Sequence, residues 1–345
     1  MTAIASAEVV PFALPFREPY VTARGELRRR EIALLRLRDA DGVIGLGEAV
    51  PLSMRGGATL AEVVAELEAI EEFGEAALAR LELSAPARCA ATTALIDLEE
   101  RRQASPHSAP DPVPCNATLI AGEPAAVAED ARRWAEQGYE TFKLKLGAGD
   151  DDVAQVEAVR EAVGPEAQIR VDANASWDLE TAVRILVAIE PLGIQLAEQP
   201  VATMERAAEL AARTSIPLAA DESVATPAEA LRAAQTGAFA LTGLKLAKAG
   251  GLVTALRIAG DLPAYATSAL DGPVGIALGA RLAARLRPLP WPATGTRSHG
   301  LATQQLFAST VASVESELRD GRLHPPPGPG LGVEIDEDAL AAHRL

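Results

Sequence analysis

The chain has 345 residues, 48 of them acidic and 32 basic, which gives a net charge of −16. Nucleic acids and anionic membranes attract clustered Lys and Arg, so this charge argues against both as partners. The chain is 48% hydrophobic, yet it offers no apolar run of about eighteen residues and no signal-peptide pattern, so we expect a cytoplasmic globular protein.

The first part of the chain predicts a small α+β unit. Strands of an antiparallel meander are expected at residues 6–15, 31–39 and 43–47. One helix is expected from Thr59 to about Leu81, because Thr59 and Glu62 have the spacing of a capping box. A second helix is expected at residues 86–103, with proline in the first turn, where its missing N–H does no harm.

The middle of the chain predicts an α/β barrel. A proline-rich connector, residues 104–114, marks a domain boundary, because it suits neither a helix nor a central strand. Beyond it, short apolar strands alternate with amphipathic helices, which is typical of parallel βαβ units. The strands are expected near residues 115–119, 141–146, 168–173, 194–198, 217–221, 240–246, 264–268 and 291–296. The helices are expected at residues 123–136, 152–162, 179–189, 204–214, 227–235 and 252–259. Eight strands in this order predict a (β/α)₈ barrel.

The last part of the chain, from about Glu317, contains a run of proline and glycine and ends in polar, irregular sequence. We expect this tail to fold back onto the first domain. The predicted organisation is a first domain of residues 1–113, a barrel of residues 114–316 and a tail of residues 317–345.

Lysine is rare in this chain. Only four are present, at positions 143, 145, 245 and 248, so 28 of the 32 basic residues are arginine. Lys143 and Lys145 lie two apart on a predicted strand and therefore share a face. Two neighbouring ammonium groups repel, so we expect a lowered pKa for each and a proton-transfer role for the pair. The alternative is a solvated strand edge that carries two charges.

One acidic residue stands at the end of each of three successive predicted strands: Asp172, Glu198 and Asp221. Lys145 precedes these three acids and Lys245 follows them. Each residue in this series of five is 23 to 27 residues from the next, which is about the length of one βα unit. Because the strands are parallel, these side chains should converge at one edge of the barrel. Three oxygen donors without His or Cys favour Mg²⁺. Taken singly, each acid has an ordinary alternative as a helix N-cap or a loop residue.

A cation beside lysines suits the removal of a proton next to a carboxylate. That proton is very weakly acidic, and its loss places two negative charges on the oxygens of an enediolate. A divalent cation lowers the barrier as this charge develops, while a desolvated Lys takes the proton.

The order Lys-x-Lys, Asp-x-Asn, Glu-Gln-Pro, Ala-Asp-Glu-Ser and Lys-x-x-Lys-x-Gly-Gly resembles the muconate lactonizing enzyme subgroup of the enolase superfamily. The resemblance implies a modified (β/α)₇β TIM barrel under an α+β capping domain, which the N-terminal part and the C-terminal tail build together. It also implies that the strand count includes one antiparallel start. The residues that it implies as Mg²⁺ ligands, with Mn²⁺ as a substitute, are Asp172, Glu198 and Asp221.

The resemblance also assigns roles to the lysines. It implies that Lys145 and Lys245 are the acid/base pair, that Lys143 lowers the pKa of Lys145, and that Asn174 lies just outside the metal ligands. Within the subgroup, residues 25–31, 45–52 and 269–275 resemble the o-succinylbenzoate synthases of menaquinone synthesis. These dehydrate 2-succinyl-6-hydroxy-2,4-cyclohexadiene-1-carboxylate, and the resemblance implies that Lys145 is the base while Lys245 stabilises the enediolate.

Other members of the subgroup remain alternatives. Dipeptide epimerases usually carry Asp-x-Asp after the eighth strand, where this chain has residues 295–300 without such a pair. An epimerase or racemase of dipeptides or N-acylamino acids is therefore less favoured. Muconate cycloisomerases have an acid where Asp271 lies, which keeps lactonisation open. Outside the family, a Schiff-base aldolase and a metal-stabilised ligand-binding barrel are further alternatives.

The substrate is expected to be a small carboxylate. Ser268 and Asp271 are candidate substrate contacts from the barrel, and two loops of the first domain, near residues 20–25 and 53–57, should choose the substrate. In these loops Arg24 and Arg55 are best suited to a distal carboxylate, with a solvated loop arginine as the alternative. Among the four histidines only His299 lies near the predicted mouth, and we expect it on the surface.

Overall fold

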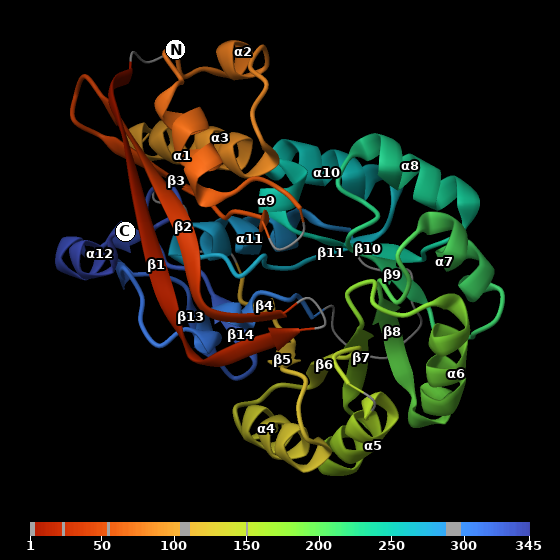
Figure 1. Ribbon diagram of the computed structural model, residues 1–345. Helices are drawn as coiled ribbons and strands as arrows, with labels where there is room; N and C mark the ends of the chain where they lie inside the picture. Colours follow the sequence, from red (N-terminus) through yellow and green to blue (C-terminus); the bar gives the residue numbers. More distant parts are fainter. Residues whose placement is uncertain (1–3, 23–24, 54–55, 104–110, 150, 288–297) are drawn as a thin grey trace.

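The computed structural model describes residues 4–345 except 23–24, 54–55, 104–110, 150 and 288–297. Figure 1 shows an N-terminal unit of long strands and helices beside a sheet that curls inside a ring of helices. We call the described part of residues 4–102 the cap and the described part of residues 117–300 the barrel. Among the helices within these bounds and in the tail, none is both long and apolar enough to cross a membrane.

The cap contains an antiparallel sheet in the order β1–β2–β3. Its strands are β1 (Ile4–Thr22), β2 (Gly25–Asp39) and β3 (Ile44–Ala49). The predicted meander is thus confirmed, with longer strands than expected. At the β2–β3 turn the Asp39 carboxylate accepts the N–H groups of Asp41 and Val43 at 3.0 and 2.8 Å, which fixes the reversal.

The cap helices differ from the prediction at one place. The single helix expected from Thr59 to Leu81 is wrong, because the chain forms α1 (Leu60–Glu68) and α2 (Glu75–Leu78) instead. The Thr59–Glu62 capping box is present. Between the two helices the chain leaves the helical path to bury Ile70 and Phe73 in the cap core, and extended Gly74 begins α2.

Helix α3 (Ala85–Arg102) packs directly on the cap sheet. A Cβ atom at Gly45 would lie 2.2 Å from the Ala94 carbonyl oxygen, and one at Gly47 would lie 2.0 Å from that of Ala90. Glycine at both positions therefore lets the helix backbone approach strand β3.

The barrel sheet has seven strands in the order β11–β10–β9–β8–β7–β6–β5, and every pairing is parallel. The strands are β5 (Ala117–Leu119), β6 (Thr141–Lys145), β7 (Gln168–Asp172), β8 (Ile194–Glu198), β9 (Leu218–Ala220), β10 (Leu241–Leu244) and β11 (Ala264–Ala266). The first seven predicted barrel strands are confirmed, while the eighth, residues 291–296, lies outside the described residues.

The ring closes through a short segment further along the chain. His299 bridges Cys115 in parallel, and Gly300 bridges Thr267 in parallel. The expectation of an antiparallel start to the barrel is wrong, since β5 pairs with β6 in parallel and the antiparallel pairing belongs to β4 (Val113–Pro114).

The helices connect the parallel strands and cover the outside of the sheet (Figure 1). They are α4 (Pro124–Glu136), α5 (Asp152–Val163), α6 (Leu179–Ile189), α7 (Met204–Ala211), α8 (Pro227–Thr236), α9 (Leu246–Ala249), α10 (Leu252–Asp261) and α11 (Pro273–Arg285). The six predicted helices are confirmed. Helices α9 and α11 were not predicted from the sequence, although α11 holds nine buried residues.

The tail forms short strands and a helix. Strand β12 (Ala312–Val314) lies just before the tail, and the tail contains β13 (Glu317–Arg319), β14 (Arg322–His324), β15 (Glu334–Ile335) and α12 (Glu337–His343). Helix α12 lies against β1, and Glu337 pairs with Arg36 of β2 at 2.7 Å. The tail therefore returns to the cap as predicted, while the exact domain limits at residues 113 and 316 stay a prediction.

Candidate active site

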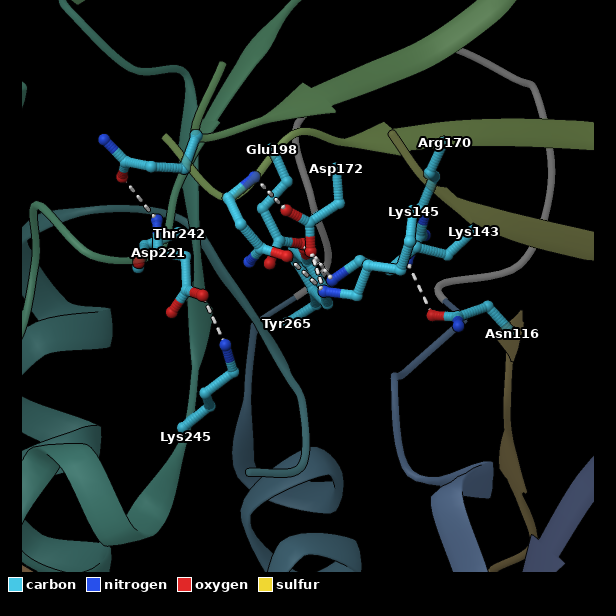
Figure 2. Close-up of polar contacts among 12 residues, drawn as sticks. Asn116, Lys143, Lys145, Arg170, Asp172, Glu198, Asp221, Thr242, Lys245 and Tyr265 are labelled. Carbon is cyan, nitrogen blue, oxygen red and sulfur yellow. Dashed lines mark hydrogen bonds and ion pairs between the residues drawn. The ribbon is translucent and has the colours of Figure 1, made fainter. Parts of the chain in front are cut away.

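Lys143 and Lys145 project from β6 into the interior at the carboxyl edge of the barrel (Figure 2). They are only 5% and 6% exposed, so the alternative of a solvated strand edge is wrong. The Lys143 ammonium lies 2.8 Å from Asp172 Oδ2 and 2.6 Å from Glu198 Oε2. The Lys145 ammonium donates to the same Asp172 oxygen at 2.6 Å and to Asn174 Oδ1 at 3.1 Å.

The three predicted acids come from neighbouring strands at the same edge. Asp172 ends β7, Glu198 ends β8 and Asp221 directly follows β9, and all three are fully buried. Lys245 directly follows β10 and forms an ion pair with Asp221, which Lys248 also contacts, at 2.9 Å from Asp221 Oδ1. The structure therefore brings together the lysines and carboxylates that the strand spacing predicted.

The electrostatics of the lysines differ from the expectation. Burial is the largest influence on Lys143 and acts to lower its pKa, but Asp172 and Glu198 outweigh it and raise the pKa well above the usual value. The pKa of Lys145 is also raised: burial, the largest influence, and the nearby Lys143 lower it, but the negative charge of Asp172, with smaller contributions from Tyr20 and Glu198, outweighs them. The predicted lowering is wrong because each ammonium lies within 2.8 Å of a carboxylate oxygen, and this attraction favours the charged form.

The same contacts act on the acid. Burial alone would raise the pKa of Asp172, yet Lys143, Lys145 and Lys245 overcome it and hold this pKa far below its ordinary range. Asp172 is therefore a permanent negative charge at physiological pH.

The donor set fits a hard divalent cation. It consists of carboxylate oxygens alone, and Glu198 Oε1 is buried without a hydrogen-bond partner in the described structure. The carboxylates point largely at lysines in Figure 2, and within the described residues no three such side chains are grouped closely enough to hold a metal ion. A shared cation thus requires Asp172, Glu198 and Asp221 to turn toward one point.

Two residues that were not predicted from the sequence, Tyr265 and Arg170, support this cluster of carboxylates and lysines. Tyr265 of β11 is fully buried and donates its hydroxyl to Glu198 Oε2. Arg170 of β7 lies 5.0 Å from the centre of the Tyr265 ring. Because Tyr265 holds Oε2, the other Glu198 oxygen is the one available to a cation. The sequence signal that could have revealed Tyr265 is a tyrosine, whose hydroxyl needs a hydrogen-bond partner when buried, within an otherwise apolar strand.

The segment after β11 forms one wall of the pocket. Ser268 lines the pocket, and its Oγ accepts the N–H of Asp271 at 2.8 Å. Asp271 lies behind this wall, 6% exposed, and accepts the N–H of Ala269 at 2.8 Å. The predicted surface position of His299 is wrong, since this residue is buried and its Nδ1 accepts the N–H of Ala266 at 3.0 Å.

Backbone strain gathers at the same barrel edge. Residues other than glycine adopt positive φ after three of the strands: Asn174 at 48° and Ala175 at 62° after β7, Gln199 at 36° after β8, and Leu270 at 66° after β11. Such conformations persist where surrounding contacts hold them, and they cluster at functional sites.

The pocket between the cap and this edge has a volume of about 840 Å³, open solvent included. Its described lining comprises Tyr20, Leu27, Arg30, Pro51, Leu52, Thr118, Lys143, Lys145, Asn174, Lys245, Thr267, Ser268, Ala269, Leu270, Gly300 and Thr303. Of these, Arg30 is the one charged group from the cap, 8% exposed, and it donates to the Pro51 carbonyl oxygen at 2.6 Å. The predicted cap arginines, Arg24 and Arg55, lie outside the described residues.

Comparisons with known proteins agree with this geometry. The family model described as enolase C-terminal domain-like matches residues 126–339. The o-succinylbenzoate synthase of Thermobifida fusca is 38% identical over 239 residues, which cover 67% of this chain and 70% of that protein. Muconate cycloisomerase 1 of Pseudomonas putida is 31% identical over 358 residues, covering 94% and 93% of the two chains.

Solved structures show the same fold over the whole chain. The muconate lactonizing enzyme from Pseudomonas fluorescens, complexed with muconolactone, has a TM-score of 0.91 and 28% identity, with 100% of both chains covered. The dipeptide epimerase from Cytophaga hutchinsonii, complexed with Mg and D-Ala-L-Val, has a TM-score of 0.87 and 25% identity, with 99% of this chain and 98% of that one covered.

Proposed function

The chain belongs to the enolase superfamily, and on that premise we propose that it is a Mg²⁺-dependent lyase of the o-succinylbenzoate synthase type. The reaction removes the proton next to the carboxylate of 2-succinyl-6-hydroxy-2,4-cyclohexadiene-1-carboxylate and expels hydroxide as water. It would serve menaquinone synthesis in the cytoplasm. The observation that carries the proposal is the buried row of carboxylates Asp172, Glu198 and Asp221 between lysines at the mouth of the barrel.

Lys145 is the residue proposed to move the proton. It lines the pocket, and Asn174 and Asp172 fix its ammonium group from behind. Its contact with Asp172 favours the ammonium form, and turning Asp172 toward a cation would remove that contact. As a neutral amine Lys145 takes the α-proton, and the electron pair of the broken C–H bond first moves onto the carboxylate as an enediolate. It then forms the new double bond as the C–O bond breaks. The ammonium so formed returns its proton to the departing hydroxide.

Lys245 is proposed to act from the other side of the pocket. It also lines the pocket, but it comes from the end of β10, on the far side of the three acids. Its positive charge stabilises the enediolate without exchanging a proton. Lys143, bonded to both Asp172 and Glu198, positions these carboxylates rather than reacting.

Asp172, Glu198 and Asp221 are the residues that would hold Mg²⁺, with Mn²⁺ as a substitute. When bound, the cation would offset the negative charge that develops on the substrate carboxylate as the proton leaves. The buried Glu198 Oε1, which accepts no hydrogen bond in the described structure, supports this assignment.

The cap side of the pocket favours a substrate with a second carboxylate. Leu27, Pro51 and Leu52 give it an apolar surface, and Arg30 places one guanidinium in it. A guanidinium binds a carboxylate through paired hydrogen bonds. We therefore propose Arg30 for the succinyl carboxylate, while the reacting carboxylate lies at the lysine end.

The test is incubation of the chain with Mg²⁺ and the cyclohexadiene substrate in D₂O, followed by NMR. We expect aromatic o-succinylbenzoate to form, with one water lost for each substrate consumed. Exchange or inversion at the α-carbon of a substrate without loss of water would defeat the dehydratase. A borohydride-trapped adduct with activity that survives EDTA would instead support a Schiff-base aldolase.

The second candidate is an epimerase of dipeptides or N-acylamino acids. It is favoured by one observation: Lys145 and Lys245 both line the pocket, one from each side of the acids, as a two-base mechanism needs. This candidate predicts that each of two enantiomers exchanges its α-proton with solvent. It also predicts that Lys145→Ala and Lys245→Ala abolish exchange of opposite enantiomers, whereas a dehydratase needs one lysine as base.

A further inference from the structure

A glutamate of the cap reaches into the barrel. Glu48 lies on β3 and is only 3% exposed. Its Oε1 accepts the N–H of Gly272 at 2.6 Å, and its Oε2 accepts the N–H of Val274 at 3.3 Å. The two partners lie 224 and 226 residues further along the chain. This contact is therefore made between cap and barrel, not within either.

The contact replaces a missing helix cap. Helix α11 begins after Gly272, which has no side chain and so forms no side-chain cap. Pro273, the first helical residue, has no N–H to satisfy. The free N–H groups of Gly272 and Val274 thus need acceptors, and the Glu48 carboxyl group supplies both.

The barrel leaves room for this carboxyl group through two glycines. A Cβ atom at Gly272 would lie 2.7 Å from Glu48 Oε2, and one at Gly275 would lie 2.9 Å from Glu48 Oε1 and 2.7 Å from the Cβ of Asp271. Any larger residue at either position would displace the glutamate. The sequence Asp271-Gly-Pro-Val-Gly275 is therefore shaped as a receptor for Glu48.

The receptor directly follows the segment that forms the pocket wall. Thr267, Ser268, Ala269 and Leu270 all line the pocket. Leu270 holds a positive φ of 66°, a conformation that needs support from its surroundings. Two local hydrogen bonds, from Asp271 N–H to Ser268 Oγ and from Ala269 N–H to Asp271 Oδ2, shape the segment, but they do not anchor its far end. Glu48 provides that anchor at Gly272, two residues beyond Leu270.

We propose that Glu48 is a positioning residue that fixes the pocket wall 267–270 by holding the start of α11. Docking of the cap therefore also completes the substrate pocket, because the carboxyl group that joins the cap to the barrel is the one that fixes the pocket wall. The proposal rests on the proposed function only in taking this pocket as the substrate site.

The test compares Glu48→Gln with the intact chain by hydrogen–deuterium exchange and by binding of o-succinylbenzoate in the presence of Mg²⁺. Gln keeps the size of the side chain, but its amide group presents an N–H where Glu48 offers an acceptor. We expect about tenfold faster exchange or more across residues 267–275, since a buried N–H group left without an acceptor costs about 1–3 kcal/mol. We expect about tenfold weaker binding of o-succinylbenzoate, a raised KM with kcat within about threefold, and unchanged Mg²⁺ affinity.

Gly275→Ala attacks the same contact from the barrel side and keeps the test decisive if Glu48→Gln folds poorly. The two changes should be non-additive, so that the double variant exchanges no faster than the more affected single variant. Glu68→Gln, an exposed glutamate of α1 in the cap, is the matched control and should change neither exchange nor binding.

Unchanged exchange across residues 267–275, or fully additive effects of Glu48→Gln and Gly275→Ala, would overturn the proposal. Faster exchange with unaltered ligand binding and KM would also overturn it, because the contact would then be structural only. If the intact chain fails to bind o-succinylbenzoate, the proposed function fails, while the exchange experiment still decides whether Glu48 fixes the wall.

Discussion

Two groups of buried carboxyl groups lie near the pocket, one at the carboxyl edge of the barrel strands and one where the cap meets the start of α11, and they have opposite surroundings. The barrel group, Asp172, Glu198 and Asp221, contacts lysines through short ion pairs. The cap-side group, Glu48 and Asp271, accepts backbone N–H groups instead. The pKa of Asp172 is held far below its ordinary range by lysines, whereas burial and the nearby Asp271 raise the pKa of Glu48 to about 8.

The difference separates two tasks. Negative charge in the barrel group is stabilised by fixed cations, which suits a group that must hold a metal ion next to a proton-transfer residue. The cap-side group lacks that support, so its charge is costly and its value lies in hydrogen bonds that set the shape of the wall. Changes in the barrel group should therefore abolish chemistry, while changes in the cap-side group should alter fit and stability.

The largest effect is expected at Lys145. Replacing Lys145 by Met removes the proposed base while keeping an unbranched chain, and kcat should fall by about 10³-fold or more. Steady-state assay of o-succinylbenzoate formation checks this. The control is Mg²⁺ binding by the same variant, which should persist. Activity within tenfold of the intact chain would show that another group takes the proton.

The next largest effect is expected on Mg²⁺ affinity, which should depend on the barrel group of carboxylates and not on the cap-side group. Glu198→Gln removes a proposed ligand, and Mg²⁺ affinity should fall by about 100-fold or more, with activity recovered partly at high Mg²⁺. Glu48→Gln, the same chemical change in the cap-side group, should leave Mg²⁺ affinity unaltered. Calorimetric titration of both variants measures the contrast. Equal losses in the two variants would refute the division of tasks.

A smaller effect is expected at Arg30. Arg30→Met should raise KM about tenfold or somewhat more for a substrate with two carboxylates, with little change in kcat, because a hydrogen bond to a charged group contributes about 1.5–3 kcal/mol. Arg30→Lys should recover part of the loss. A substrate analogue without the succinyl carboxylate is the control, and it should bind equally to all three proteins. An equal loss for this analogue would argue against Arg30 as the carboxylate contact.

The smallest effect is a pH dependence of stability. Glu48 has a pKa of about 8 in the folded chain against 4.5 without burial, so the folded state binds its proton more tightly. Its contribution to the free energy of unfolding is therefore full below about pH 4.5 and falls as pH rises toward 8, by about 1.4 kcal/mol per pH unit. Asp271, whose pKa is also raised, acts in the same direction.

Denaturant unfolding between pH 5 and 8 measures how the free energy of unfolding changes with pH. Glu48→Gln should reduce this pH dependence by the contribution of one titrating group, about 1.4 kcal/mol per pH unit. The ionisable groups that act on this pair are Cys89, Arg30 and Lys245, through their interactions with Asp271 or Glu48. Asp172, whose pKa is held far below its ordinary range, keeps its charge across this range and should add no slope. An identical slope in the intact chain and in Glu48→Gln would contradict the assignment.

The barrel site was largely predictable from the sequence, because it repeats with the βα unit. Lys145, Asp172, Glu198 and Asp221 each stand at the end of an apolar strand, and parallel strands bring their ends together without knowledge of any tertiary contact. The sign of the lysine pKa shifts was missed, since it depends on which oxygen each ammonium touches rather than on spacing.

The contact between cap and barrel could not be predicted in this way. Glu48 lies in a strand of the cap, and its partner Gly272 lies 224 residues away, with no periodic pattern linking them. Gly272 and Gly275 can be read from the sequence, but their role depends on the Glu48 carboxyl group that occupies the space beside them. Similarly, the break after Glu68 follows from burial of Ile70 and Phe73, which helical propensity does not reveal.

The central claim is that the three carboxylates between the lysines bind one divalent cation. Crystals grown with Mn²⁺ and measured at its absorption edge test this claim most directly. We expect a single strong anomalous peak within about 2.0–2.3 Å of an oxygen of each of Asp172, Glu198 and Asp221. A Mn²⁺ peak elsewhere, with these carboxylates still bound to Lys143, Lys145 and Lys245, would contradict the account.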